Sequence, residues 1–485
     1  MALIVYNTLS NKKEEFKPLN GKSVKIYVCG PTVYDFLHIG NFRGPVFFNL
    51  VRNWLEHLGY QVTYILNYTD VDDKIISRAK KENTTQGDIA NKYIAEYRKD
   101  FEILGLRPHD RNPRVTEFMD QIIATIEKLI ANKKAYVVDG DVWCSVQDIP
   151  GYGKLSGKDL EGLIAGHRVE VGEKKKYPAD FALWKKAKSG EPSWASPWGN
   201  GRPGWHIECT AMSQSILGDT IDIHGGGVDL IFPHHENEIA QSEGASGKEF
   251  VKYWMHWEFL NFSEQKMSKS LGNVVTLRQF VEKFHPEIYK FMILLGHYRK
   301  KIDFSDAQVD HAISGLARIY SSLCLASEVL KVNVKAEPLD AEFKKVLDDG
   351  ANGIEAALND DFGTPEVMAR LFESVRAFNH YQRGQKVTPK VVARAEALVK
   401  WFSEYGRMMA LFQEEPHAFL YYLDNMLLKK ANVKREEVDS LVLERKEARK
   451  AKDFAKADEV RNKLNALNIN VSDMPDGTTF WEVKK

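Results

Sequence analysis

A strand, a helix and a second strand in direct succession constrain the fold of this chain more than any other feature. Residues 24–29 alternate and then become apolar, and the turn Gly30-Pro31-Thr32 follows them. Apolar side chains then recur at helical spacing over residues 46–55, and residues 62–66 show a second strand pattern. This length suits a parallel crossover, so we expect an α/β domain with a parallel sheet.

The ends of these strands indicate where a ligand would bind. In open α/β sheets, ligands bind beyond the carboxyl ends of the strands, so Cys29 and Thr69 are expected to face one crevice. The segment His38-Ile39-Gly40-Asn41 stands where the intervening helix begins. Free N–H groups and the helix dipole favour anions at such an end, which suits His38 for binding a phosphate.

Residues 204–243 contain a second group of chemically active side chains. The stretch 220–223 followed by Gly225-Gly226-Gly227 is typical of a strand that ends in a turn open to a ligand. Pro233 fits the first turn of a helix, which places His234 and Glu238 four residues apart on one face. Zinc accepts these donors together with Cys209, and a fourth ligand is still needed. A zinc protease helix is excluded, because His235-Glu236 lacks its second His.

Length and composition restrict the remaining possibilities. A chain of 485 residues is expected to form roughly three domains. Because 67 basic residues balance 67 acidic ones, contact with nucleic acid requires a local basic surface. No apolar run reaches the roughly 18 residues of a membrane span, so we expect a cytoplasmic protein without membrane contact. Four scattered cysteines make disulfides unexpected, and Cys144 and Cys324 are interpreted as packing residues.

The middle of the chain alternates between helical and irregular patterns. Residues 88–132 show helical periodicity, whereas residues 136–200 combine short strand patterns with frequent glycines. This change indicates an insertion between two halves of the α/β domain. A strand pattern over 253–262 then leads to a polar loop at 264–273.

The C-terminal part has a different composition. Residues 275–430 are helical by periodicity and indicate a helical bundle. Residues 429–463 contain 12 Lys or Arg against 8 Asp or Glu, which is a local basic excess. Two short strand patterns, at 468–471 and 479–483, follow this segment.

Several motifs resemble those of a known family. His38-Ile39-Gly40-Asn41 looks like the His-Ile-Gly-His signature of class I aminoacyl-tRNA synthetases, and Lys266-Met267-Ser268-Lys269-Ser270 matches their Lys-Met-Ser-Lys-Ser signature. More narrowly, residues 27–32, 204–209 and 224–238 resemble cysteinyl-tRNA synthetases, and the resemblance covers nearly the full length. That family commonly has Asn where Asn41 departs from the class signature, so the departure supports the narrower resemblance.

The resemblance implies a fold and a division into domains. We expect a Rossmann-type parallel-sheet catalytic domain with an insertion, followed by a helical bundle and a small C-terminal α/β module. The expected parts are the first half of the catalytic domain (1–132), the connective insertion (133–200), the second half with the zinc site (201–262), the signature loop and stem-contact region (263–310), the tRNA-binding helical bundle (311–425) and the basic anticodon-binding module (426–485).

The resemblance also implies an activity and its residues: activation of L-cysteine with ATP, transfer to tRNA(Cys), and a monomeric enzyme. The ligands of one zinc ion per chain would be Cys29, Cys209, His234 and Glu238, with Cys29 as the missing fourth. Catalytic roles would belong to His38, Asn41, Lys266 and Lys269. Nucleotide contacts would come from Gly40, Gly227, Asp229 and Lys269, and Mg²⁺ would accompany the ATP. The cysteine pocket would be lined by Thr69, Trp205 and His224.

Physical reasons connect these residues with that chemistry. Attack of a carboxylate on the α-phosphorus of ATP needs orientation and positive charge, which Lys266 and Lys269 would direct at the departing pyrophosphate. An apolar pocket separates cysteine from serine by little more than ~100-fold. Zinc prefers thiolate sulfur, so hydrolytic editing would be unnecessary. Because a catalytic zinc usually keeps an open position, the substrate would add as a fifth ligand or displace Glu238.

Two other functions remain as alternatives. A cysteine ligase of thiol-cofactor biosynthesis shares the activation site but joins cysteine to an amino sugar, and it needs no anticodon domain. The helical bundle and the basic C-terminal segment favour the synthetase over that ligase. A non-catalytic zinc protein that binds nucleic acid would need neither ATP signature.

Overall fold

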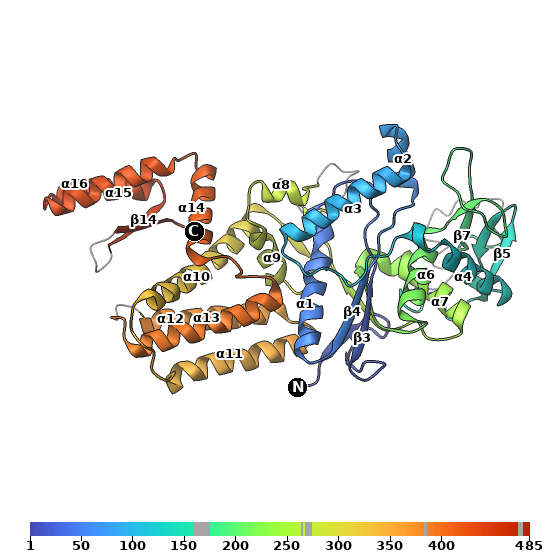
Figure 1. Cartoon of the computed structure of the whole chain (residues 1–485), viewed down its shortest axis with the longest axis horizontal. Helices are drawn as coiled ribbons and strands as arrows, with labels where there is room; N and C mark the ends of the chain where they lie inside the picture. The colour runs from blue at the N-terminus through green and yellow to red at the C-terminus, as the bar shows by residue number, and fades with distance from the viewer. Residues whose placement is uncertain (159–174, 263–264, 267–273, 383–385, 474–478) are drawn as a thin grey trace. The chain divides into compact units, whose positions relative to one another are not determined.

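The computed structural model describes residues 1–158, 175–262, 265–266, 274–382, 386–473 and 479–485 (Figure 1). The chain divides into two compact units. Unit 1 comprises Met1–Arg278, Gly296–Asp303 and Glu355–Pro365. Unit 2 comprises Gln279–Leu295, Phe304–Ile354 and Glu366–Lys485. The finer domain boundaries expected from the sequence stay predictions.

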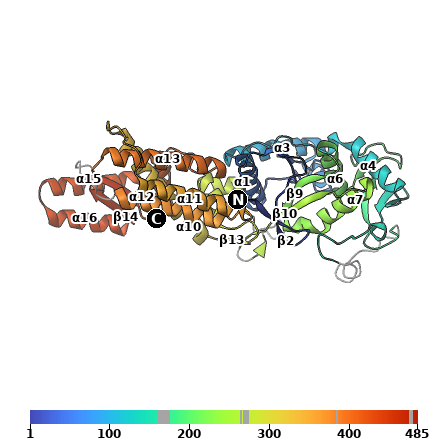
Figure 2. The ribbon, with the colours of Figure 1, turned by 90° about the horizontal axis from the view of Figure 1, so that it is seen from below.

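A four-stranded parallel sheet forms the centre of unit 1. Its order is β10 (Val251–Trp257), β9 (Ile221–Gly227), β3 (Ser23–Val28) and β4 (Gln61–Leu66). The register of β3 with β4 runs from Ser23 opposite Gln61 to Val28 opposite Leu66. Figure 2 shows β9 and β10 side by side in this sheet. The predicted α/β class and parallel crossover are therefore confirmed.

The crossover between β3 and β4 is a buried helix. A 3₁₀ turn, η1 (Ile39–Phe42), runs directly into α1 (Arg43–His57), which lies beside β4 (Figure 1). The apolar side chains expected on its inner face are all buried: Val46, Phe47, Leu50, Val51, Trp54 and Leu55. In a crossover of this kind the start of the helix lies at the carboxyl edge of the sheet. This edge therefore brings η1 and the end of β3 together.

The helical region expected over 88–132 is interrupted. After α2 (Asp73–Glu82), the helix α3 (Gln86–Ile103) ends before Gly105, whose φ of 62° is left-handed, and the next helix is α4 (Met119–Ala131). Glycine adopts this conformation without strain. Pro108 and Pro113 lie in the connection and disfavour a helix there.

The insertion contains an antiparallel sheet that shares the core of unit 1. Its strands, in order, are β5 (Ala135–Val138), β6 (Asp141–Cys144), β7 (Phe181–Lys186) and β8 (Gly201–Pro203). The helices α6 (Trp205–Leu217) and α7 (Glu236–Ser246) follow this sheet in the chain. One buried cluster joins Leu129 of α4, Val142 and Trp184 of this sheet, and Ile207 of α6. The insertion thus supports the helices that flank the parallel sheet.

The predicted turn at 225–227 is wrong. β9 continues through all three glycines, which pair with Met255, His256 and Trp257 of β10. A Cβ atom at Gly225 would lie 2.3 Å from the Phe48 ring, and one at Gly226 would lie 2.4 Å from the His235 ring. Gly225 and Gly226 are therefore required by close packing inside a strand, which is a common reason for glycine there.

The predicted strand over 253–262 is divided in two. β10 ends at Trp257, and β11 (Leu260–Phe262) belongs to another sheet, in the order β12 (Gln265–Lys266), β11 and β13 (Ile302–Phe304). Part of the expected loop is therefore the short strand β12, and 267–273 lie outside the described residues. An N-terminal hairpin, β1 (Ile4–Asn7) with β2 (Lys12–Glu15), was not predicted from the sequence.

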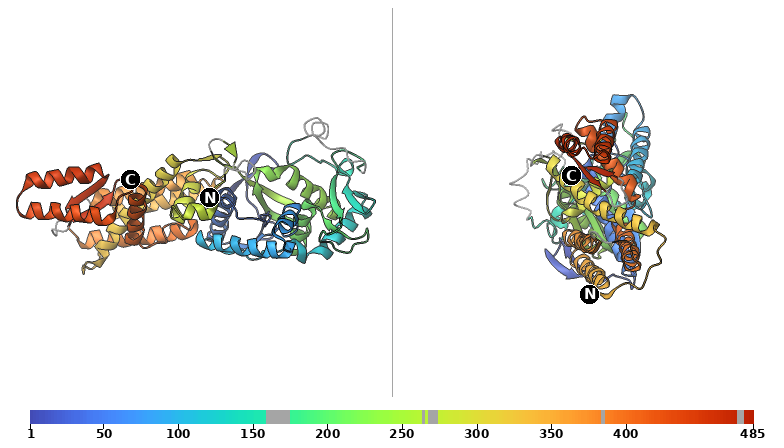
Figure 3. Two further views of the ribbon diagram at one scale, coloured as in Figure 1. Left: turned by 90° about the horizontal axis from the view of Figure 1, so that it is seen from above. Right: turned by 90° about the vertical axis from the view of Figure 1, so that its left-hand side faces the viewer.

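Unit 2 is a helical bundle that continues into a small α/β module. Its helices are α9 (Pro286–Leu295), α10 (Asp306–Lys331), α13 (Pro389–Met409), α14 (Pro416–Lys430), α15 (Arg435–Lys450) and α16 (Phe454–Ala466), with most of α8 (Leu277–Val281), α11 (Ala341–Asn359) and α12 (Thr364–Gln382). α15 and α16 pack as a helical hairpin (Figure 3), and β14 (Ile469–Asp473) pairs antiparallel with β15 (Thr479–Val483). The predicted bundle and C-terminal strands are confirmed.

Within the described part of the chain, one helix is long and apolar enough to cross a membrane. This helix, α10, has a mean hydropathy of 1.2 over its most apolar window, and 56% of that window is buried. Core helices of globular proteins pass the same test. Leu316, Ile319 and Tyr320 of α10 are buried within the structure, as expected for a bundle helix.

Candidate active site and metal centre

Four side chains predicted as metal ligands converge at the carboxyl edge of the parallel sheet. Cys29 follows β3, Cys209 lies in α6, His234 lies in the short segment η5 (Ile231–His235), and Glu238 lies in the first turn of α7. The Cys29 Sγ atom is 3.6 Å from Cys209 Sγ and 3.3 Å from Glu238 Oε1. His234 Nε2 is 3.0 Å from the same Glu238 oxygen. We name this group the Cys29 cluster; one ligand atom from each residue lies within 4.8 Å of the others.

The spacing within the Cys29 cluster fits a tetrahedral zinc ion. Zinc bonds of about 2.3 Å to sulfur and about 2.1 Å to oxygen separate two sulfurs by ~3.8 Å, and a sulfur from an oxygen by ~3.6 Å. The corresponding distances in the cluster, 3.6 Å and 3.3 Å, are within a few tenths of an ångström of these values. Two thiols, one imidazole and one carboxylate are also donors that zinc accepts.

The local sequence explains how His234 and Glu238 come to share one face. Phe232 has extended backbone angles (φ −137°, ψ 131°) and interrupts the short π-helical segment η5 (Ile231–His235). Helical backbone continues from His235 into α7, so His234 and Glu238 lie one turn apart. The predicted four-residue spacing on one helical face is therefore confirmed.

Electrostatics place negative charge on two members of the Cys29 cluster, Cys209 and Glu238, and keep protons on the other two, Cys29 and His234. A hydrogen bond from Cys29 and the nearby His234 lower the pKa of Cys209 to about 6, although burial opposes this. Burial also opposes the charge of Glu238, but His224 and His234 outweigh it and lower the pKa to about 2. For His234, burial is outweighed by Glu238 and Cys209, which raise its pKa to about 10. Burial raises the pKa of Cys29 well above its usual value, so this thiol acts as the donor to Cys209.

Glu238 is held from a second side by His224. His224 Nε2 lies 2.9 Å from Glu238 Oε2, and its ring stacks on Trp254 with centroids 4.7 Å apart. His224 and Glu238 are both 0% exposed, so their contact is fully buried. Cys29, His224, His235 and Glu238 form a second candidate metal group. The Cys29 cluster suits zinc better because it contributes two thiols instead of one.

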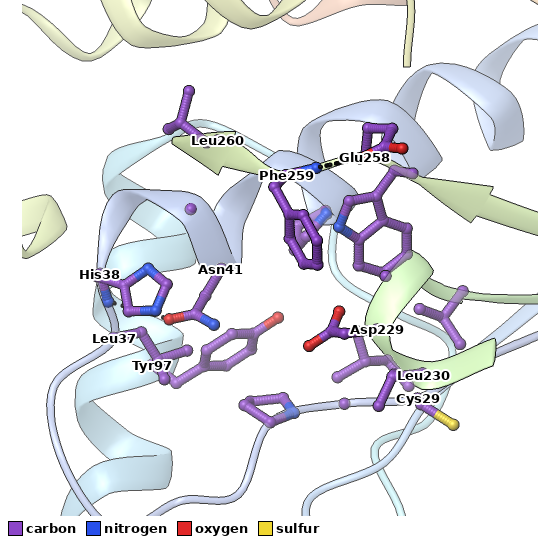
Figure 4. A pocket seen from close by; sticks show the side chains of 18 residues that line it. Cys29, Leu37, His38, Asn41, Tyr97, Asp229, Leu230, Glu258, Phe259 and Leu260 are labelled. Atoms are coloured by element: carbon purple, nitrogen blue, oxygen red, sulfur yellow. Dashed lines mark hydrogen bonds between the residues drawn. The ribbon is translucent and has the colours of Figure 1, made fainter. Parts of the chain in front are cut away.

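A cavity of about 250 Å³ opens beside the Cys29 cluster (Figure 4). Six of the residues that the sequence singled out line it: Cys29, His38, Gly40, Asn41, Gly227 and Asp229. The backbone N–H of His38 donates to Asn41 Oδ1 at 3.1 Å, which fixes the signature segment at the start of η1. The structure thus brings the signature segment, the end of β9 and the Cys29 cluster to one cavity.

Three other predicted residues, Thr69, Trp205 and His224, are not among the residues that line this cavity. Thr69 is buried, and its Oγ1 donates to Glu208 Oε2 at 3.3 Å. The ring of Trp205 lies 4.4 Å from the His234 ring and is 41% exposed, while His224 contacts Glu238 as described. The Thr69 N–H donates to Pro31 O, so Thr69 does lie at the edge of the sheet where β3 ends before Cys29.

The signature lysines cannot be placed in the same way. Lys266 belongs to β12, and Lys269 lies outside the described residues. Sequence reasoning also missed several residues that line the cavity, among them Tyr97, Trp257 and Glu258. Trp257 and Glu258 stand at the carboxyl end of β10, so the strand-end rule could have found them. Tyr97 lies on α3, where no sequence signal indicates a site.

Comparison with known proteins identifies the family. Residues 15–314 match the family described as "tRNA synthetases class I (C) catalytic domain". The cysteine-tRNA ligase of Bdellovibrio bacteriovorus is 59% identical over 484 residues, which is 100% of both chains. The chain belongs to the cysteinyl-tRNA ligases. The cysteine-tRNA ligase of Geobacter sulfurreducens is 47% identical over 485 residues, again across 100% of both chains.

The remaining comparisons extend over the rest of this ligase. Residues 353–413 match a DALR domain, and residues 435–481 match the anticodon binding domain of cysteinyl-tRNA ligases. Methionyl-tRNA synthetase of Mycobacterium tuberculosis, in complex with methionyl-adenylate, shares the fold at a TM-score of 0.60. The two sequences are 14% identical, and the likeness covers 80% of this chain and 90% of that chain. The enzyme is thus a class I cysteine-tRNA ligase with ATP, an amino acid and tRNA as substrates.

Proposed function

We propose that this ligase selects L-cysteine through one zinc ion held by Cys29, Cys209, His234 and Glu238. The observation that carries the proposal is the Cys29 cluster, whose ligand atoms lie within 4.8 Å of one another beside the cavity. When bound, zinc would supply a preference for thiolate over hydroxyl ligands and would keep the substrate thiol deprotonated. Serine would then be rejected by the chemistry of its side chain.

Cys29 connects amino-acid selection with activation. It belongs to the Cys29 cluster and also lines the cavity. A substrate whose side chain reaches the cluster would therefore extend its carboxylate into that cavity. Thr69, Trp205 and His224 are proposed to shape the pocket around the substrate. Trp205 and His224 contact cluster residues, and Thr69 contacts Glu208, which precedes Cys209 in the chain. Holding the carboxylate near ATP supplies most of what activation requires.

Activation would form cysteinyl-adenylate and release pyrophosphate. His38, Gly40 and Asn41 stand where η1 begins, and the free N–H groups of a helix start bind phosphate. Lys266 and Lys269 would stabilise the charge on the departing pyrophosphate, together with Mg²⁺. A Cβ atom at Gly227 would lie 2.5 Å from Asp229 Oδ1, so glycine keeps this carboxylate close to the backbone, where it can accept from ribose hydroxyls.

The contact between His224 and Glu238 affects how the substrate thiol would bind the metal. A carboxylate that leaves a metal in a buried site needs another partner, or its charge is strongly destabilised. Glu238 already has one, because His224 contacts its Oε2 atom while Oε1 faces the Cys29 cluster. His224 would therefore keep the Glu238 carboxylate partnered if the incoming thiolate took its place at the metal.

The cysteine would then be transferred to tRNA(Cys), which the C-terminal part of the chain is proposed to recognise. Residues 435–481 match an anticodon binding domain, and residues 429–463 have a basic excess that suits phosphate contacts. We further propose a monomeric enzyme in the cytoplasm, by analogy with the family.

The test combines metal analysis with two activity assays on the purified enzyme. We expect one zinc per chain, ATP-pyrophosphate exchange that depends on cysteine and fails with serine, and charging of tRNA(Cys). Removal of zinc with a chelator should abolish the cysteine-dependent exchange, and added zinc should restore it. Full exchange in a metal-free enzyme would refute the selection mechanism, and exchange without charging would refute the transfer step.

A further inference from the structure

One buried hydroxyl in the cavity has no part in the mechanism proposed above. Tyr97 of α3 lines the cavity and is 3% exposed. Among the described residues, its hydroxyl oxygen has no hydrogen-bond partner. A buried hydroxyl without a partner costs about 1 to 3 kcal/mol, so most such groups in native proteins are satisfied. A group left in this state beside a substrate cavity is expected to gain its partner from the substrate.

The ring of Tyr97 is fixed against the signature segment. It stacks on Phe42, with centroids 5.8 Å apart and planes at 14°, and it meets the edge of Tyr68 at 5.5 Å. Phe42 directly follows Asn41, so this stacking couples the position of Tyr97 to the segment proposed to bind phosphate. Figure 4 shows the Tyr97 hydroxyl pointing into the cavity between Asn41 and Asp229.

The chemical state of Tyr97 suits a donor. Burial raises the pKa of its hydroxyl well above the usual value, and Tyr68, Tyr64 and Asp100 add to this rise. The phenol therefore stays protonated at the pH where the enzyme works. It can donate to an anionic oxygen, and a hydrogen bond to a charged acceptor is stronger than one between neutral groups.

We propose that the Tyr97 hydroxyl donates a hydrogen bond to an oxygen of the α-phosphate during amino-acid activation. The proposal rests on the nucleotide site described under the proposed function, because it needs the phosphate beside His38 and Asn41. This contact would come from α3, which lies outside both signature motifs of the class I synthetases. In this arrangement the phosphate lies between the signature segment and the phenol, and the hydroxyl is satisfied only when the nucleotide is bound.

The test compares Tyr97→Phe with a matched variant, Tyr64→Phe. Tyr64 is also buried, its hydroxyl also has no partner among the described residues, and it is not among the residues that line the cavity. Both substitutions keep the ring and remove only the hydroxyl. In cysteine-dependent pyrophosphate exchange, Tyr97→Phe should lower kcat/KM for ATP by about 10- to 100-fold, as loss of a charged hydrogen bond predicts. Tyr64→Phe should leave kcat/KM for ATP unchanged. Both variants should keep a Tm close to that of the wild type, because each loses only one hydroxyl.

Inhibitors identify which part of the nucleotide is contacted. AMP and adenosine differ by the phosphate alone, so Tyr97→Phe should raise the inhibition constant of AMP about tenfold and leave that of adenosine unchanged. An equal change for both, an unchanged kcat/KM for ATP, or an equal loss in Tyr64→Phe would overturn the proposal. The zinc content and the rejection of serine are measured on the wild type, so failure of zinc selection would be seen separately.

Discussion

Cysteine and histidine side chains meet in both units of the molecule, with opposite chemical consequences. In unit 1, Cys209 belongs to the Cys29 cluster and its pKa is lowered to about 6. In unit 2, Cys324 Sγ lies 3.3 Å from both ring nitrogens of His417, yet burial and the carboxylates of Glu328 and Glu415 raise its pKa to about 11. A cysteine next to a histidine is therefore not sufficient for a metal site.

The difference lies in the other donors. Cys209 has a second thiol, Cys29, as a hydrogen-bond donor, and Glu238 completes the group. The Nε2–H of His417 instead donates to the Glu328 carboxylate, so this nitrogen is engaged by an acid and not by a second thiol. Within the described residues, the candidate metal groups include Cys29 and exclude Cys324. Convergence of three or four donors decides the function of each cysteine.

The largest expected effect comes from replacing Cys209 in unit 1, and the matched replacement in unit 2 is at Cys324. Cys209→Ser should lose zinc and cysteine-dependent exchange together. The activity should fall by more than the ~10- to 100-fold seen when only an outer partner of a ligand is lost. Cys324→Ser should keep both. Zinc per chain and pyrophosphate exchange measure the outcome, and Cys144→Ser, another buried cysteine of unit 1, controls for packing. Full zinc in Cys209→Ser would contradict the assignment.

The next effect concerns the histidine behind Glu238. His224→Gln should weaken zinc binding by ~10- to 100-fold, because partners that orient a metal ligand contribute about this much. The affinity is measured by competition with a chelator of known zinc affinity. His417→Gln, at the corresponding pair of unit 2, should leave zinc binding unchanged. Equal zinc affinity in the wild type and His224→Gln would show that His224 does not hold Glu238 for the metal.

These two sites also show how far the sequence could predict the molecule. The parallel crossover and the shared helical face of His234 and Glu238 were predictable, because strand periodicity and residue spacing are local properties. Membership of Cys29 in the site followed from strand order and from family resemblance. The continuation of β9 through Gly227 was not predictable from local pattern. Gly225 is required by the Phe48 ring and Gly226 by the His235 ring, and both rings come from other elements of the fold.

The role of Tyr97 and the pairing of Cys324 with His417 were hidden for the same reason. Tyr97 reaches the cavity because α3 packs beside η1, where its ring stacks on Phe42. Cys324 and His417 are 93 residues apart in the chain and meet only through the packing of α10 with α14. Side chains that meet through tertiary packing carry no periodic signal of their own.

A smaller effect should appear in the reactivity of Cys324. Because its pKa is raised to about 11, the thiolate fraction should increase about tenfold per pH unit from pH 7 to 10. The rate of alkylation by iodoacetamide, which requires the thiolate, should follow the same slope. Mass spectrometry of the Cys324 peptide measures the rate, with Cys324→Ser as the blank. A rate that levels off near pH 8 would mean that His417 activates this thiol after all.

The smallest expected effect concerns the ion pair between Arg394 and Asp340 in unit 2, which serves to stabilise the fold and not to bind a ligand. Arg394 contacts both carboxylate oxygens of Asp340, at 2.6 and 2.8 Å, and lowers the pKa of Asp340 to about 2. An unfolded Asp has a pKa of about 3.9. The pair should therefore stabilise the folded state fully above pH ~4 and lose this contribution as the pH falls towards about 2.

Replacement of Arg394 checks this prediction. Arg394→Gln should lower the Tm at neutral pH by about 2 to 4 °C, as the loss of about 1 kcal/mol does in a unit of this size. The difference from the wild type should shrink as the pH is lowered below 4, because the Asp340 carboxylate becomes protonated in both proteins. Zinc content and exchange activity at neutral pH should remain those of the wild type. A Tm difference that stays constant down to pH 3 would assign the loss to packing of the Arg394 side chain on Tyr381, whose ring lies 4.2 Å from the guanidinium.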